Sequence, residues 1–141
     1  MRLKKPFVLF FFISIVTIKS HACECTQTSA NSTLESYFNN AKLVFEGETI
    51  ERKHGKNQVL GYTKIKTLRW WKGKSEDYII INRLAGKQCD FSFQTSQRYL
   101  VFALWDKKHK VYRVSTCGYS KRSSESKHEF SQLSSIILKI K

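Results

Sequence analysis

The sequence Ala22-Cys23-Glu24-Cys25 places two cysteines at the point where a secretion signal ends. The other two cysteines of the chain, Cys89 and Cys117, lie far away in sequence. If each early cysteine bonds to one late cysteine, the start of the mature protein is pinned across the domain and cannot fray. This stretch is therefore the starting point for both the fold and the function.

Residues 1–22 have the three-part pattern of a signal peptide, with a basic start, an apolar run over residues 7–18, and small residues Ser20 and Ala22 before the cleavage point. The apolar run is too short for a transmembrane helix, which needs about 20 apolar residues. We therefore expect a secreted protein, extracellular or periplasmic. Lipidation of Cys23 is the alternative, but a lipoprotein signal normally has Leu where this chain has Ser20.

Cleavage after Ala22 would leave residues 23–141, which suits a single domain. The leader holds four basic and no acidic residues, so the formal charge falls from +14 for the whole chain to +10 for the mature part. This charge favours anionic partners such as an acidic glycan or a membrane surface, although it is also typical of a merely well-solvated surface. Nucleic acid is not an expected partner of an exported protein.

Four cysteines in an oxidising compartment predict two disulfides. A Cys23–Cys25 bond would be strained, because residues i and i+2 of an extended chain lie about 7 Å apart. Two pairings with Cys89 and Cys117 remain, and each bond would stabilise the fold by roughly 4–5 kcal/mol in the chain-entropy model. A zinc site is the competing role for the cysteines, but C-x-C lacks the usual C-x2-C spacing.

The remaining pattern predicts a mainly β fold with two flanking helices. Alternating or apolar segments predict five strands, over residues 41–51, 58–71, 77–84, 97–104 and 110–116. Residues 52–57, 106–109 and 121–125 are expected to be turns or connectors. Five short strands of this kind favour a Greek-key barrel of the OB type.

The helices are expected over residues 32–40 and 126–140. Ser32 with Glu35, and Ser126 with Glu129, have the spacing of capping boxes. The second helix would bury one face, formed by Phe130, Leu133, Ile136, Ile137 and Ile140.

One basic and aromatic cluster is a candidate binding patch for an acidic glycan, made of Arg69, Trp70, Trp71, Lys72 and Lys74. The alternative is that one of the two tryptophans packs in the barrel. No catalytic motif is present, and His54, His109 and His128 are expected to face solvent, so we expect neither an enzyme nor a bound cofactor.

Several ordered pieces resemble the N-terminal domain of the tissue inhibitors of metalloproteinases, within the netrin-like module family. These are Cys23-Glu24-Cys25, the segment AKLVFEG at 41–47, Trp71-Lys72-Gly73, Cys89 followed by RYLVFA at 98–103, and Thr116-Cys117-Gly118. The resemblance spans about residues 23–118 and is to the short, single-domain type seen mostly in bacteria. It implies an OB-type barrel and the disulfides Cys23–Cys89 and Cys25–Cys117.

The resemblance also implies a role for the mature N-terminus. In the animal inhibitors the α-amine and carbonyl oxygen of the first residue, here Cys23, chelate the catalytic zinc of the protease. Protease contacts would then come from Cys23, Glu24 and Cys25. An acidic residue at the position of Glu24 departs from this pattern, because the pocket that receives it is usually apolar and an unpaired carboxylate is costly to bury.

Overall fold

The computed structural model describes Cys23, Cys25 and residues 33–56, 59–86 and 89–140. The predicted signal peptide and Glu24 lie outside these residues. The elements in chain order are α1 (Leu34–Asn40), β1 (Leu43–His54), β2 (Val59–Lys72), β3 (Tyr78–Leu84), β4 (Arg98–Asp106), β5 (Val111–Arg113), β6 (Lys121–Arg122), the 3-10 helix η2 (Ser123–Glu125) and α2 (Lys127–Ile140). The expectation of a mainly β fold with two helices is confirmed.

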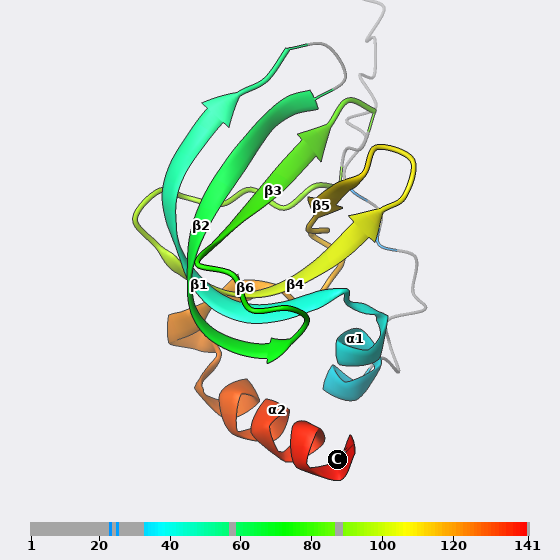
Figure 1. Cartoon of the computed structure of the whole chain (residues 1–141), viewed down its shortest axis with the longest axis vertical. Coiled ribbons are helices and arrows are strands. Elements are labelled where there is room, and N and C mark those ends of the chain that lie inside the picture. The colour runs from blue at the N-terminus through cyan, green and yellow to red at the C-terminus, as the bar shows by residue number, and fades with distance from the viewer. Residues whose placement is uncertain (1–22, 24, 26–32, 57–58, 87–88, 141) are drawn as a thin grey trace, which may run out of the picture.

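Five of the strands form a ring, in the order β1-β2-β3-β5-β4 and back to β1 (Figure 1). All neighbours are antiparallel except β3 and β5, which are parallel and meet at a single pair, Ile81 with Tyr112. The sixth strand, β6, pairs with the start of β4 and makes the sheet six-stranded.

Alternation along the strands divides the apolar side chains into two cores. On β4, Tyr99, Val101 and Ala103 face the inside of the ring, whereas Leu100 and Phe102 face the helices. The inner core is completed by Leu43, Phe45, Ile65, Ile79, Ile81, Phe93 and Val114. The outer core joins Phe38 and Ala41 to Val44 and Trp71, and to Leu133 and Ile136 of α2. Strand β4 is therefore buried on both faces.

Helix α1 begins one residue later than the predicted capping box implies. Thr33 is the N-cap, and its hydroxyl accepts a hydrogen bond from the Ser36 amide at 3.3 Å. At the other end, Lys72 Nζ donates to the carbonyl oxygens of Phe38 and Asn39, at 2.7 and 2.8 Å. Lys72 therefore supplies partners for carbonyls that a helix C-terminus leaves unsatisfied.

Helix α2 also departs from the predicted capping box. The Ser126 hydroxyl donates to the Arg122 carbonyl oxygen, and Glu129 turns toward Lys121. Leu133 and Ile136 are buried as expected, but Ile140, which was also expected on the buried face, is 65% exposed.

Two predicted strands had wrong limits, and one predicted connector was wrong. Strand β1 continues to His54, because residues 52–54 still pair with β2. Strand β5 covers only three residues, because the chain leaves β4 after Arg113 and Ser115 pairs with Asp90 instead. The predicted connector over residues 121–125 forms β6 and η2.

Candidate functional site

Two short backbone segments lie side by side, and they carry Cys89 and Cys117. The segment that begins at Cys89 runs antiparallel to the segment that follows β5: the Phe91 amide donates to the Val114 carbonyl at 2.7 Å, and the Thr116 amide to the Cys89 carbonyl at 2.8 Å. The pairing of Asp90 with Ser115 lies between these two bonds. Cys89 and Cys117 are therefore held at fixed positions on neighbouring backbone segments.

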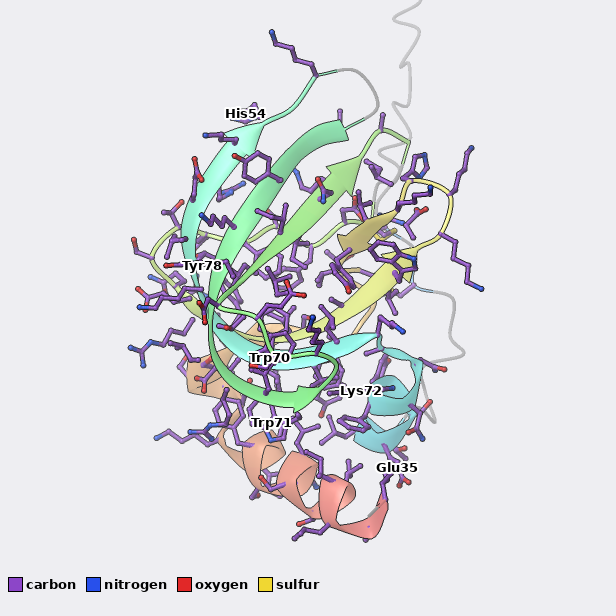
Figure 2. The ribbon with its side chains drawn as sticks, in the orientation of Figure 1. Glu35, His54, Trp70, Trp71, Lys72 and Tyr78 are labelled. Carbon is purple, nitrogen blue, oxygen red and sulfur yellow. A yellow bond between two sulfur atoms is a disulfide. The ribbon has the colours of Figure 1, made fainter. Side chains whose placement is uncertain are left out.

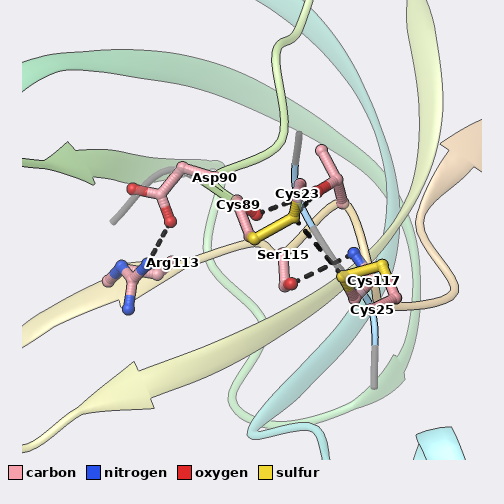
Figure 3. Close-up of a disulfide and its surroundings, with 8 residues drawn as sticks. Cys23, Cys25, Cys89, Asp90, Arg113, Ser115 and Cys117 are labelled. Atoms are coloured by element: carbon pink, nitrogen blue, oxygen red, sulfur yellow. Dashed lines mark hydrogen bonds and ion pairs between the residues drawn. A yellow bond between two sulfur atoms is a disulfide. The ribbon is translucent and has the colours of Figure 1, made fainter. Parts of the chain in front are cut away.

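The N-terminal cysteines attach to these two segments (Figure 3). Cys23 pairs with Cys89 and Cys25 with Cys117, and the Cα atoms of the pairs are 5.3 and 5.4 Å apart. This is the pairing that the family resemblance implies. The two disulfides touch, because Cys23 Sγ lies 3.5 Å from Cys117 Sγ.

The cysteine site is accessible from solvent. Cys25 is exposed and Cys23 is half-buried, and Thr116 Oγ1 lies 3.3 Å from Cys23 Sγ. The sulfur atoms of Cys23, Cys25 and Cys117 lie within 4.8 Å of one another. All four cysteines are in disulfides, however, so these sulfurs are not thiolates that could bind zinc.

A buried ion pair supports the segment that carries Cys89. The Asp90 side chain is only 5% exposed; it pairs with Arg113 and accepts a hydrogen bond from the Leu84 amide at 2.9 Å. Arg113 Nη1 also lies 3.8 Å from Asp106 Oδ2. Asp106 Oδ1 accepts a hydrogen bond from the backbone amide of His109 at 3.0 Å. Losing Arg113 would leave the buried Asp90 carboxylate without its ion-pair partner, which is costly.

His109 is not the solvent-facing residue that we expected. Its side chain is 23% exposed, and its Nδ1 lies 3.1 Å from Asp106 Oδ1. Hydrogen bonds from the His109 backbone and ring lower the pKa of Asp106. His54 and His128 are exposed, as expected.

The predicted basic and aromatic patch is split by the sheet (Figure 2). Trp71 is 9% exposed and stacks on Phe130 of α2, with ring centroids 5.3 Å apart. Trp70, its neighbour in sequence, points to the other side of β2 and packs on Phe45. Both tryptophans thus belong to the cores, which is the alternative considered for one of them.

The basic members of the patch are also placed separately. Arg69 lies over the Trp71 and Phe130 rings, and Lys72 is bound to α1. Lys74 is exposed beyond the end of β2. The structure therefore does not bring the five residues into one exposed aromatic surface.

Glu129 of α2 forms a charged cluster with Lys121 and Tyr119, which the sequence did not indicate. Glu129 is 7% exposed, and its Oε1 accepts hydrogen bonds from Lys121 Nζ at 2.5 Å and from the Tyr119 hydroxyl at 3.2 Å. Burial alone would raise the pKa of Glu129, but the bonds from Lys121 and Tyr119 outweigh burial and lower it. Burial and the nearby Glu129 charge raise the pKa of Tyr119.

Comparison with known proteins adds no assignment to this geometry: no protein-family model matches the chain, and no curated protein matches it significantly. The two disulfides indicate an environment outside the cytoplasm. Among the residues that the structure describes, no helix is both long and apolar enough to cross a membrane.

Proposed function

We propose that this protein is a secreted, disulfide-stapled inhibitor of a zinc metalloproteinase, acting through the mature N-terminus at Cys23. The observation that carries the proposal is the pair of touching disulfides. They fix Cys23 and Cys25 at positions that solvent can reach, next to Cys89 and Cys117. A segment held in this way loses little conformational freedom when a partner binds, and such preorganisation favours affinity.

The chemistry requires Cys23 to be the first residue after removal of the leader. Its α-amine, with a typical pKa near 8, would then be partly unprotonated at neutral pH and could bind a metal together with the Cys23 carbonyl oxygen. Catalytic zinc sites hold three protein ligands and leave one position open for water or substrate. The N-terminus would occupy that position and displace the water.

The ring of strands supports the finer fold proposal, an OB-type barrel of the netrin-like family. The strand order β1-β2-β3-β5-β4 closes on β1, with the parallel contact between β3 and β5, as in a five-stranded Greek-key barrel. The C-terminal helix α2 covers the outer face of the same sheet.

Glu24 defines the kind of protease. Its carboxylate would enter the pocket next to the zinc, and an apolar pocket would leave this charge unpaired at a cost of several kcal/mol. We therefore propose a target whose pocket carries a basic side chain, rather than a protease with an apolar pocket.

The test compares two forms of the exported protein against a panel of zinc metalloproteases: one that starts at Cys23 and one with a single extra Ala before it. We expect only the first to inhibit, because the extra residue removes the α-amine from the chelating position. Equal inhibition by both forms would contradict the mechanism. Intact disulfides and equal melting temperatures would show that the extra residue leaves the fold unchanged.

A second candidate is a module that binds anionic glycans or a membrane surface, and the high positive charge supports it. The burial of Trp70 and Trp71 does not favour the patch around residues 69–74 as its site. Failure of the protein to bind an anionic glycan at low salt, where surface charge is least screened, would argue against this candidate.

A further inference from the structure

Strands β1 and β2 extend to the end of the ring that lies away from the two helices (Figure 1). Residues near this end of the two strands line a basic pocket. Its volume is about 190 Å³, and most of its lining comes from Arg52, Lys53, His54, Thr63, Arg83 and Thr95. These residues belong to β1, β2, β3 and the connector before β4. Four elements therefore contribute to one cavity.

Strand register explains how His54 and Arg83, two residues of the pocket lining, are brought to the same face of the sheet. Gly61 of β2 pairs with His54 of β1 on one side and with Arg83 of β3 on the other. Cross-strand partners point to the same face, so the His54 imidazole and the Arg83 guanidinium flank a residue without a side chain, on strands about 9.5 Å apart. Gly61 has a φ of +152°, and a Cβ there would collide with the Lys53 carbonyl oxygen, so this position requires glycine.

The next set of cross-strand partners lies at the boundary between the ring interior and the pocket. Two residues along the strands, Thr63 pairs with Arg52 on β1 and with Ile81 on β3. Thr63 and Ile81 are buried, at 4% and 2% exposure, and Ile81 belongs to the inner core. The strand face that is apolar inside the ring thus becomes basic at its mouth, a usual location for a ligand site.

Lys53 is the one basic residue of the pocket lining that has an ion-pair partner within the described part of the chain. Among the described residues, no ion pair involves Arg52, His54 or Arg83. The nearest acidic residue in sequence, Glu51, pairs with Lys53 at 2.7 Å. Unpaired cations converging in a concave site raise the local concentration of anions.

We infer that this pocket is a binding site for a tetrahedral oxyanion, either sulfate or phosphate and including their monoesters. Arg52 and Arg83 both line the pocket, and a guanidinium group can donate two parallel hydrogen bonds to the oxygens of such an anion; the hydroxyls of Thr63 and Thr95 in the same lining are further donors. The site deepens the second candidate function by giving it a specific anionic group to bind. It is independent of the proposed inhibitory N-terminus.

The test measures binding of sulfate, phosphate, glucosamine 6-sulfate and glycerol 3-phosphate to the exported protein by isotope-edited NMR. We expect saturable binding, with the largest shifts at the amides of Thr63, Arg83 and Thr95, which line the pocket. Whichever ester binds more tightly identifies the source of the anion, a sulfated sugar or a phosphate ester.

The variant Arg52→Gln/Arg83→Gln should bind at least about tenfold more weakly, because each guanidinium contributes charge-assisted hydrogen bonds. The matched control is Lys107→Gln/Lys108→Gln, which removes the same charge from an exposed turn outside the pocket and should bind like the wild type. Neither arginine is buried, so both variants are expected to fold.

Equal weakening in both variants would show that binding follows net charge alone, and the proposal would be wrong. Absence of saturable binding by the wild-type protein, or shifts centred away from Thr63, Arg83 and Thr95, would also overturn it. Should the arginine variant not fold, the wild-type shift map still decides. Retention on an anionic glycan column despite a failed pocket test would leave the broader second candidate standing without this site.

Discussion

Glu129 is an acidic side chain buried between helix α2 and the ring. Its carboxylate is held by Lys121 and Tyr119, and these bonds lower its pKa below the ordinary value. A carboxyl group whose pKa is lower in the folded than in the unfolded state stabilises the fold above its unfolded pKa of about 4.3, and this contribution is lost as the pH falls through the folded value.

We therefore expect Glu129→Gln to reduce the free energy of unfolding by about 1–2 kcal/mol at pH 7. The difference between variant and wild type should shrink as the pH falls below about 4.3. Urea unfolding at a series of pH values measures both. Glu125→Gln is the control, since Glu125 is exposed and should behave like the wild type. A difference that stays constant down to pH 2 would contradict the role of the carboxylate charge.

At the scale of an element, α2 presents one residue to the core at each turn and leaves the opposite face in water. Leu133 has no exposed surface, whereas Leu138, in the same helix, is 77% exposed. The helix therefore contains a buried and an exposed leucine in the same secondary structure. Substituting each of these two leucines by alanine separates the contribution of side-chain packing to stability from that of helix propensity.

Leu133→Ala is expected to cost about 2–4 kcal/mol of unfolding free energy, because it removes buried methyl groups and leaves a cavity. Leu138→Ala should change stability by less than about 0.5 kcal/mol. Chemical denaturation of the two variants gives the comparison. Equal losses would mean that α2 does not pack on the outer face of the ring.

The elements also show what the sequence could predict. Long strands and both helices follow from local periodicity, and each was placed within a few residues. The short length of β5 and the presence of β6 could not be predicted in this way, because both depend on where β4 offers free backbone groups. The adjacent Trp70 and Trp71 suggested one surface, yet neighbours in a strand face opposite sides and the outer side is covered by α2.

The site was only partly predictable for the same reason. The cysteines could be recognised from their number and compartment. The basic pocket depends on Gly61 lying between His54 and Arg83, a juxtaposition of three strands that no local pattern reports.

At the scale of the whole molecule, the disulfides connect Cys23 and Cys25 to partners that lie 66 and 92 residues further along the chain. Each closes a long loop, and the loss of entropy in the unfolded state depends on the logarithm of loop length. The two bonds should therefore contribute similar amounts to stability.

Cys25→Ala/Cys117→Ala and Cys23→Ala/Cys89→Ala are each expected to lose roughly 4–5 kcal/mol, by the chain-entropy model. Guanidinium unfolding under non-reducing conditions measures these losses, and the wild type in reducing buffer should be less stable than either variant. A variant as stable as the oxidised wild type would show that its disulfide does not stabilise the fold.

The connection of Cys25 to Cys117 also sets an order of events during synthesis. The two cysteines that emerge first wait for partners that emerge much later, and Cys25 has no correct partner until most of the chain exists. Any disulfide that Cys25 forms before that moment is a wrong one, such as Cys25 with Cys89. Correct maturation of this protein thus depends on an oxidant that acts late, or on an isomerase that reopens early bonds.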